Sequence, residues 1–490
     1  MTDPRTLLGI DLGTTSVKAL LVTPGGILRG AGRSEHPAHG PRALGEQDPA
    51  EWWAGVAHAV HQALREAEAG GAVDLLGLAV AGHGPTTVAV DSMGRHLGPA
   101  ITWLDTRAST IATELSRVIG VPVWQLGSLP HERWLAANDP PAHASAVAFL
   151  SSWDWLTARL TGWLGRSVPP VSLHPTDAVI RAGGGDPARF GESVEWGTAV
   201  GGVLPGPAAE LGIPAGTPVV AGGNDALASF HGAGLVEAGD AVDAGGTAGG
   251  LGVYWDRELQ VVGTYRAPAA LPGLWLYGGA MNAVGKSVDW ALGLLAPDGG
   301  PSARDLLAEA FGLGPGADGL VFLPYLSGER APIDDERARG VLAGLSLGHG
   351  APHIMRAVLE AGGYALRHVA EPIVAAGVEL RRLVVSGAAD RMRPIAALRA
   401  DILGVPVDMP VLADTAAVGA AILAATGIGA HPDARAAIRA MVRIAERAEP
   451  HAAARATYDR VYEAYRELYP ATADLQHRLA DLGDGTPRER

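Results

Sequence analysis

Residues 7–22 read LLGIDLGTTSVKALLV, two apolar runs that flank the polar turn GTTS at 13–16. A second turn, TPGG at 23–26, leads into a third apolar run at 27–32. Short apolar runs separated by turn residues predict a β-meander. Residues 50–68 have helical spacing and good helix formers, so we expect a helix there. Because strands and helices continue to alternate along the chain, the sequence favours an α/β fold.

The length and composition of the chain exclude several classes of protein. Its 490 residues exceed one ordinary domain and suggest roughly two to four. With 48% apolar and 18% charged residues, the chain is neither disordered nor fibrous. A net charge of −14 is a poor fit for nucleic-acid binding, which needs clustered Lys and Arg. The absence of cysteine excludes disulfides, zinc thiolates and Cys nucleophiles.

No stretch of the sequence predicts a signal peptide or a membrane span. The N-terminal apolar stretch contains Asp11 and Lys18. A signal peptide needs an unbroken apolar region and a cleavage site, and neither is present. We therefore expect a soluble cytoplasmic protein with no membrane or nucleic-acid partner.

The pattern of the first turn recurs about half a chain later. DLGT at 11–14 and DAGGT at 243–247 each place an aspartate at a strand end, followed by glycine and threonine. Two such placements suggest two related halves, each with a turn of the size that holds a phosphate.

The GTTS turn contains residue types that suit a phosphate. Gly13 allows a backbone N–H to approach an anion closely, and Thr14 and Thr15 add hydroxyl donors. Lys18 adds positive charge and is one of only two lysines in the chain, the other being Lys286. The alternative is a polar β-turn between two strands.

Other polar residues lie in turns where catalytic or binding groups often occur. Asp225 follows an apolar strand in the turn GGND, where it is placed for catalysis or for capping the next helix. His83 lies in a Gly-His-Gly-Pro turn, and Trp103 and Asp105 lie in ITWLDTR at a strand end. Each of these three residues is ambiguous alone, since Asp-x-Arg is usually a surface ion pair.

Residues 280–287, AMNAVGKS, fit a relaxed phosphate-loop pattern that includes Lys286. An apolar run precedes them and a helical pattern follows, so a P-loop NTPase is a competing hypothesis. Against it, the interior of the loop is not glycine-rich, and no obvious second acidic motif lies nearby.

Several blocks in a fixed order resemble the FGGY family of carbohydrate kinases. GIDLGTTSVKALLV and DAGGTAGG resemble its two phosphate motifs, and ITWLDTRA resembles a family strand end. AGGNDALASFHGAG carries the position of the catalytic aspartate. LPYLSGERAP and then residues 340–360 resemble the second family signature, while VVSGAADRMRPIAALRADILGVPV with AAVGAAILAATGIG resembles the adenosine motif. These blocks run from residue 7 to about 429, nearly the whole chain.

The resemblance implies a two-domain α/β fold of the actin/hexokinase (ribonuclease H-like) type with a central cleft. A first domain at 1–236 would bind the sugar and carry the catalytic aspartate, and a second at 237–475 would bind the nucleotide. Residues 476–490 are expected to form a flexible tail. The resemblance also implies ATP and Mg²⁺, a small sugar or polyol as substrate, and a homodimer.

The same resemblance implies roles for individual residues. Asp225 becomes the general base, and Asp11 and Asp225 become the Mg²⁺ ligands. The residues expected at the sugar are His83, Gly84, Trp103, Asp105 and Asp225. Those expected at ATP and its phosphates are Gly13, Thr14, Thr15, Lys18, Gly246, Thr247, Gly285, Gly387, Ala388 and Ala389. Lys286 becomes an accident of the sequence or a secondary ATP contact.

Two departures from the family pattern bear on function. Where the family usually has three glycines, this chain has Gly387-Ala388-Ala389, whose methyl groups could crowd the nucleotide. The sugar turn, GHGP at 82–85, lacks the Arg-Glu pair of glycerol kinases and resembles the Met-His-Gly of xylulokinases. We therefore expect a ketopentose such as xylulose as the substrate. The alternative is a catalytically impaired or regulatory nucleotide-binding member of the superfold.

Overall fold

The computed structural model describes residues 3–37, 45–169, 175–243, 249–297, 302–386 and 389–484. The chain forms two compact units. Unit 1 contains Met1–Val236, Ala269–Pro272 and Asp414–Arg443, and unit 2 contains Glu237–Pro268, Gly273–Ala413 and Ile444–Arg490. A single boundary after residue 236 would assign Asp414–Arg443 to the second half, whereas its contacts place this segment in unit 1.

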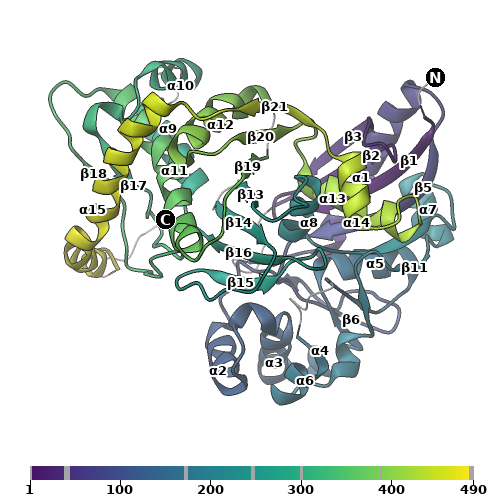
Figure 1. Ribbon diagram of the computed structural model, residues 1–490. Helices are drawn as coiled ribbons and strands as arrows, with labels where there is room; N and C mark the ends of the chain where they lie inside the picture. The colour runs from purple at the N-terminus through teal and green to yellow at the C-terminus, as the bar shows by residue number, and fades with distance from the viewer. Residues whose placement is uncertain are drawn as a thin grey trace. The chain divides into compact units, whose positions relative to one another are not determined.

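Unit 1 is built on a six-stranded sheet that begins with the predicted meander (Figure 1). The strand order is β11 (Ala199–Gly202), β12 (Pro218–Asn224), β5 (Asp74–Gly82), β1 (Arg5–Leu12), β2 (Ser16–Val22) and β3 (Leu28–Glu35). β1, β2 and β3 are antiparallel, whereas β5 is parallel to β1 and β12 is parallel to β5. The carboxyl ends of β1, β5 and β12 therefore meet at one edge of the sheet.

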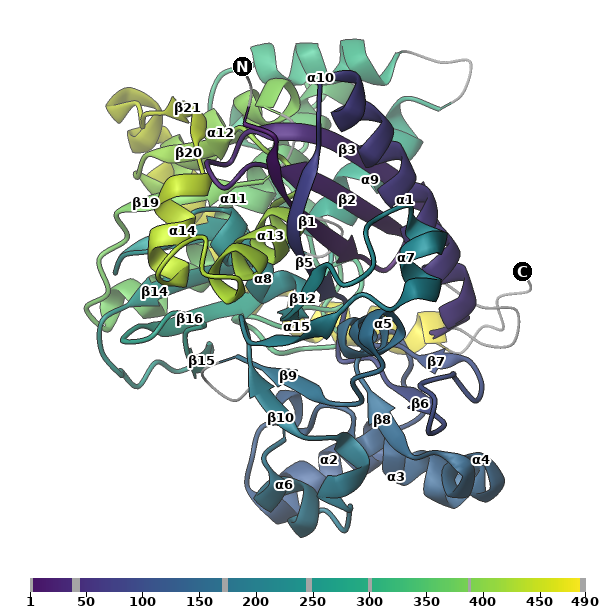
Figure 2. The ribbon, with the colours of Figure 1, turned by 90° about the vertical axis from the view of Figure 1, so that its right-hand side faces the viewer.

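Helices cover both faces of this sheet, as Figure 2 shows for α1 (Pro49–Ala69) and α13 (Thr415–Gly427). Successive side chains of a strand point to opposite faces. Leu8 and Ile10 pack in the core with α1, while Gly9 faces α13. A Cβ on Gly9 would lie 1.9 Å from the Ala417 carbonyl oxygen, so only glycine allows this close approach.

The predicted helix at 50–68 is α1, which begins after Asp48 accepts a hydrogen bond from the Ala50 N–H. The other helices of unit 1 are α2 (Ser109–Ile119), α3 (Leu129–Asn138), α4 (Pro140–Ser145), α5 (Ser152–Thr161), α6 (Asp177–Ala182), α7 (Pro205–Leu211), α8 (Asp225–Gly232) and α14 (Ala434–Met441). Its short strands are β4 (Glu46–Gln47), β6 (Val88–Val90), β7 (Ala100–Ile101), β8 (Ala148–Leu150), β9 (Arg166–Val168) and β10 (Ser193–Glu195).

Unit 2 repeats the arrangement of unit 1. Its strand order is β15 (Tyr265–Pro268), β16 (Trp275–Ala280), β14 (Gly250–Trp255), β13 (Asp240–Asp243), β19 (Arg382–Val385), β20 (Val407–Pro410) and β21 (Ile444–Ala448). β13, β14 and β16 form an antiparallel meander, and β19 and β20 continue it in parallel, as β5 and β12 do in unit 1. The recurrence of the Asp-Gly-Thr pattern in the sequence thus corresponds to two sheets of the same topology.

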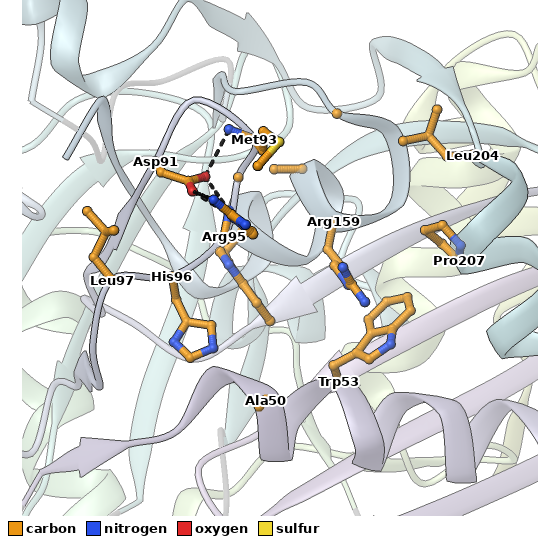
Figure 3. A pocket seen from close by; sticks show the side chains of 14 residues that line it. Ala50, Trp53, Asp91, Met93, Arg95, His96, Leu97, Arg159, Leu204 and Pro207 are labelled. Atoms are coloured by element: carbon orange, nitrogen blue, oxygen red, sulfur yellow. Dashed lines mark hydrogen bonds and ion pairs between the residues drawn. The ribbon is translucent and has the colours of Figure 1, made fainter. Parts of the chain in front are cut away.

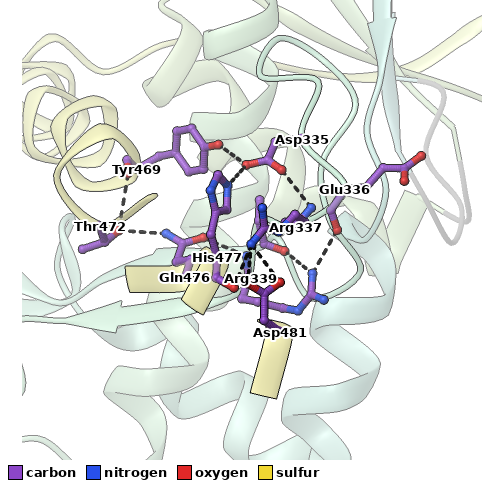
Figure 4. Close-up of polar contacts among 10 residues, drawn as sticks. Asp335, Glu336, Arg337, Arg339, Tyr469, Thr472, Gln476, His477 and Asp481 are labelled. Carbon is purple, nitrogen blue, oxygen red and sulfur yellow. Dashed lines mark hydrogen bonds and ion pairs between the residues drawn. The ribbon is translucent and has the colours of Figure 1, made fainter. Parts of the chain in front are cut away.

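The last helix of unit 2, α15 (Ala452–Asp484), is long and contains most of the C-terminal part of the chain. The other helices of this unit are α9 (Val284–Leu295), α10 (Ala303–Gly312), α11 (Ala351–Ala375) and α12 (Ala389–Leu403), with short strands β17 (Val321–Leu323) and β18 (Val341–Ala343). The sequence predicts a flexible tail from residue 476, but α15 continues to Asp484. Gln476 is buried and accepts the Arg339 N–H, and His477 and Asp481 pair with Asp335 and Arg337 (Figure 4).

Among the described helices, none is both long enough and apolar enough to cross a membrane.

Candidate functional site

Asp11 and Lys18 lie opposite each other where the hairpin of β1 and β2 approaches its turn. Strand alternation places Asp11 on the same face as Gly9, the face that α13 covers, and its cross-strand partner Lys18 shares that face. Lys18 Nζ lies 3.7 Å from Asp11 Oδ2 and 2.9 Å from Asp414 Oδ1. Two carboxylates from distant parts of the sequence therefore share one lysine.

The carboxylate of Asp11 is buried and only partly satisfied. Its residue is 5% exposed, and Oδ1 has no hydrogen-bond partner among the described residues. Burial raises the pKa of Asp11 to about 7; Lys18 opposes this shift, while Asp225 and Asp414 add to it. A buried oxygen with a free lone pair, next to other carboxylates, suits a cation or a water molecule bound to one.

The GTTS turn follows Asp11 and is closed by a hydrogen bond from the Gly13 N–H to the Ser16 carbonyl oxygen (2.9 Å). Thr15 is exposed at its tip. Trp103 Nε1 donates to Thr14 Oγ1 at 3.0 Å, although the sequence separates the two residues widely. A residue expected at the sugar therefore contacts a residue expected at the phosphates.

Asp225 is the first residue of α8, but it does not cap that helix. The side chain of Asn224 accepts the N–H groups of Ala226 (3.1 Å) and Leu227 (3.3 Å) and is the N-cap. The capping interpretation of Asp225 is therefore wrong. Burial raises the pKa of Asp225 to about 6, while backbone N–H donors and the charge of Lys18 limit the shift.

The sugar turn lies close to the start of α8. His83 is 1% exposed, its Nδ1 is 2.9 Å from Thr86 Oγ1, and its Nε2 has no partner within the part of the chain that the structure describes. Burial lowers the pKa of His83 to about 3, so the imidazole is neutral. A Cβ on Gly84 would lie 2.9 Å from Trp153 and 3.5 Å from Asn224 Nδ2. The turn thus packs beside the residue that precedes the candidate base.

Trp103 and Asp105 have different surroundings. Trp103 is 45% exposed, whereas the Asp105 side chain is 4% exposed. Arg107 donates to Asp105 through its N–H and Nε and pairs with Glu46 through Nη2. Burial alone would raise the pKa of Asp105, but the hydrogen bonds and charge of Arg107 lower it below its usual value. The Asp-x-Arg motif therefore forms the ion pair that is usual for it.

In unit 2, Asp243 ends β13 at the position that corresponds to Asp11. Its antiparallel neighbour is Leu251, and Arg399 of α12 lies 3.4 Å from its Oδ2. Burial lowers the pKa of the Arg399 guanidinium, which Asp243 partly counteracts. The expected phosphate residues that follow, Gly246 and Thr247, lie outside the described residues, as do Gly387 and Ala388. Ala389 is the first residue of α12.

Gly285 and Lys286 lie in the first turn of α9, and Lys286 is exposed. Beside this turn, Glu329 forms a buried contact that the sequence did not reveal. Its Oε1 accepts the N–H groups of Asn282 (2.9 Å) and Arg330 (2.8 Å), whereas its Oε2 is buried without a partner among the described residues. Burial raises the pKa of Glu329 to about 7 against the effect of these donors.

Sequence reasoning also missed Asp414. Its sequence signal, an acidic residue before an Ala-rich helix, is that of a helix cap and does not show the contact with Lys18.

Within the ranges that the structure describes, no group of three or more His, Asp and Glu side chains is arranged to hold a metal ion.

Unit 1 also contains a cavity of about 610 Å³ at the surface of α1 and α5 (Figure 3). Its arginines are already paired, Arg95 with Asp91 (2.7 Å) and Arg159 with Glu210 (3.4 Å). The residues expected at the sugar and phosphates do not line it. The cavity is therefore separate from the site around Asp11 and Asp225.

The two sheets of one topology, each with an aspartate at the carboxyl end of its first strand, define a two-domain α/β protein of the actin/hexokinase type. Residues 6–172 match the N-terminal domain and residues 246–428 the C-terminal domain of the FGGY family of carbohydrate kinases. The chain belongs to this family and is a sugar kinase, an ATP-dependent phosphotransferase.

Individual relatives cover nearly the whole chain. Xylulose kinase of Escherichia coli K12 is 30% identical over 486 residues, which cover 94% of this chain and 98% of that protein. The crystal structure of xylulose kinase from Rhodospirillum rubrum aligns with a TM-score of 0.82 and 29% identity, covering 96% of this chain and all of that one. A glycerol kinase of Chloroflexus aurantiacus is 29% identical over 464 residues, covering 86% of this chain and 89% of that protein.

Proposed function

We propose that this kinase transfers the γ-phosphate of ATP to a hydroxyl group of a ketopentose such as xylulose, with Asp225 as the general base. The observation that carries the proposal is the unpartnered Nε2 of buried, neutral His83, in a turn that packs beside Asn224. A sugar hydroxyl bound to His83 would lie in the neighbourhood of Asp225.

Asp225 would accept the proton of the attacking hydroxyl group. Phosphoryl transfer depends mostly on positioning and on neutralising charge, so a carboxylate with a pKa of about 6 is basic enough and is ionised at neutral pH. Its Oδ1 accepts the Ala226 N–H at 2.7 Å, and because Asn224 is the N-cap of α8, Asp225 is not needed to cap the helix.

The GTTS turn would bind the phosphates. The Gly13 backbone, the hydroxyl groups of Thr14 and Thr15, and the Lys18 ammonium would stabilise charge on the transferring group. For Gly246, Thr247, Gly285, Gly387, Ala388 and Ala389, contacts with ATP and its phosphates remain what the family resemblance implies.

Asp11 fits the requirements of a Mg²⁺ ligand, because its buried Oδ1 lacks a protein partner. Mg²⁺ binds through one or two carboxylates and keeps several waters, so a site without three protein ligands is compatible with it. When bound, the ion would neutralise charge on the β- and γ-phosphates. Asp225 is the second carboxylate that we place near it.

Specificity for the sugar would come from His83, Gly84 and Trp103. His83 offers one ring nitrogen to a hydroxyl group, and the exposed Trp103 ring offers an apolar face. Because Arg107 already binds Asp105, we expect Asp105 to shape this strand end more than to bind sugar directly. Glycerol is disfavoured, since the turn lacks the Arg-Glu pair of glycerol kinases.

A coupled ADP-release assay against a panel of sugars and polyols tests the proposal. We expect kcat/KM for D-xylulose to exceed that for glycerol and gluconate by at least about 100-fold, roughly 3 kcal/mol. A preference for glycerol or gluconate would overturn the substrate assignment. ADP release that no sugar stimulates would favour the regulatory alternative.

A further inference from the structure

Asp414 occupies a position from which an aspartate normally caps a helix, yet it does not do so. It immediately precedes α13, and its side chain makes no capping hydrogen bond. A capping Asp accepts the N–H two or three residues along and stabilises the helix by about 0.5–2 kcal/mol. Here Oδ1 instead lies 2.9 Å from Lys18 Nζ. The Asp414 side chain therefore pairs with Lys18 and does not stabilise the N-terminus of α13 by capping it.

The corresponding helix of the other sheet behaves differently. α8 follows β12 as α13 follows β20, and these two strands occupy equivalent positions in the two sheets. Asn224 caps α8 with its side chain, whereas Asp414 leaves α13 uncapped. The contrast indicates that the contact with Lys18, and not helix capping, explains an acidic side chain at residue 414.

The start of α13 is held firmly in place. A Cβ on Gly232 would lie 1.9 Å from the Thr415 carbonyl oxygen, and a Cβ on Gly419 would lie 1.9 Å from that of Ala228. α8 and α13 therefore pack with their backbones in close contact, which fixes the Cα of Asp414 relative to the sheet.

Lys18 lies between two carboxylates and is nearer to Asp414 than to Asp11, at 2.9 Å against 3.7 Å. Its side chain is 25% exposed. A lysine stem has four rotatable bonds, so an ammonium released by Asp414 could close on Asp11. That contact would neutralise the carboxylate whose Oδ1 is otherwise unpartnered.

We infer that Asp414 is a positioning residue that holds the Lys18 ammonium beside the phosphate turn and away from Asp11. This inference rests on the proposed role of the turn in binding ATP. In the free protein Asp414 is the partner of Lys18, and in the nucleotide complex a phosphate oxygen takes its place. Without Asp414, Lys18 pairs with Asp11 alone and moves closer to it than 3.7 Å, and both groups are withdrawn from the nucleotide.

The test compares Asp414→Asn with the control Asp433→Asn. Asp433 caps α14 through its side chain, and because Asn caps a helix about as well as Asp, its variant reports the effect of removing a negative charge at a helix start in the same unit. We expect Asp414→Asn to raise KM for ATP about 10-fold, with kcat lowered less than about threefold and KM for the sugar unchanged. Asp433→Asn should leave all three constants within about twofold of the wild type.

A double-mutant cycle then connects the effect to Lys18. In a Lys18→Met background, adding Asp414→Asn should change KM for ATP by less than about twofold. An undiminished 10-fold effect in that background, or an unchanged KM in the single variant, would overturn the inference.

Direct binding of a non-hydrolysable ATP analogue, measured by calorimetry with Mg²⁺ present, keeps this test separate from the proposed function. If the wild type phosphorylates no sugar of the panel, the proposed function fails. The analogue's Kd for Asp414→Asn still decides the inference, with a 10-fold weakening expected and an unchanged Kd contradicting it.

Discussion

Asp11 of unit 1 and Asp243 of unit 2 lie at the carboxyl ends of equivalent strands in sheets that share one topology, but the cationic side chain beside each aspartate comes from a different kind of element. In unit 1 the cation is Lys18, on the neighbouring strand and directly opposite Asp11. In unit 2 that neighbouring position is Leu251, and the cation is Arg399 of helix α12.

The two cations also differ in their access to solvent. The side chain of Lys18 is 25% exposed, and that of Arg399 is 7% exposed. A partly exposed lysine on a long stem can exchange one partner for another, whereas a buried guanidinium is committed to its partner. One topology therefore carries a movable cation in unit 1 and a structural ion pair in unit 2.

The largest effect should come from the general base, which only unit 1 is expected to supply. Asp225→Asn keeps the size of the side chain and removes the basic carboxylate, so kcat should fall by about 10³-fold. The melting temperature should change by less than about 3 °C. Asp414→Asn, at the N-cap position of α13 that Asn224 occupies in α8, should instead raise KM for ATP. Near-normal turnover by Asp225→Asn, measured by ADP release, would remove Asp225 from the mechanism.

The second prediction sets Arg399→Met against Lys18→Met. Removing one partner of a buried ion pair leaves a buried charge, so Arg399→Met should lose about 3 kcal/mol of folding free energy. That loss lowers the melting temperature by roughly 10 °C. Lys18→Met should lose less than about 1 kcal/mol, because its site is partly exposed, but it should weaken ATP use about 100-fold. Calorimetry measures the melting temperatures. If both variants lost the same amount, Arg399 would not differ from Lys18 in its contribution to stability, and the distinction between a structural and a movable cation would be wrong.

Much of this arrangement could be predicted from the sequence, because strands and turns have local signals. The meander, α1 and the duplicated Asp-Gly-Thr pattern follow from apolar periodicity and turn residues. The register that places Lys18 opposite Asp11 follows from the short GTTS turn between them.

The remaining features depend on contacts between distant segments, which have no local signal. The return of Asp414–Arg443 to unit 1 is of this kind, and so is the contact of Arg399 with Asp243. The sequence leaves Asp225 open to catalysis or to capping α8, because Asn224 and Asp225 are both good capping residues and only the backbone geometry shows that Asn224 is the cap. The ordered end of α15 depends on side chains near residue 335 that composition does not reveal.

A third prediction concerns Glu329, the buried acid of unit 2 whose pKa, like that of Asp11, lies near 7. Because burial raises its pKa from 4.5, the folded state favours the protonated form. The stability that this provides is complete below about pH 4.5 and is lost as the pH rises through about 7. Between pH 5 and pH 8 the wild type should therefore lose about 2 kcal/mol more folding free energy than Glu329→Gln. Denaturant titrations of both proteins at pH 5 and pH 8 measure this difference. An equal change in folding free energy for the wild type and for Glu329→Gln would contradict the prediction.

The smallest effect is expected for Lys286, the other lysine of the chain. It lies exposed in the first turn of α9, and a solvated ammonium contributes little to binding. Lys286→Ala should change kcat/KM for ATP by less than about threefold, far less than Lys18→Met. The reverse order of effects would mean that AMNAVGKS acts as a phosphate loop, because a P-loop lysine binds phosphate directly. Lys286→Arg should be as active as the wild type, because the side chain at 286 is exposed. Lys18→Arg should be less active, because a compact ammonium lies between Asp11 and Asp414 and the larger guanidinium differs from it in shape.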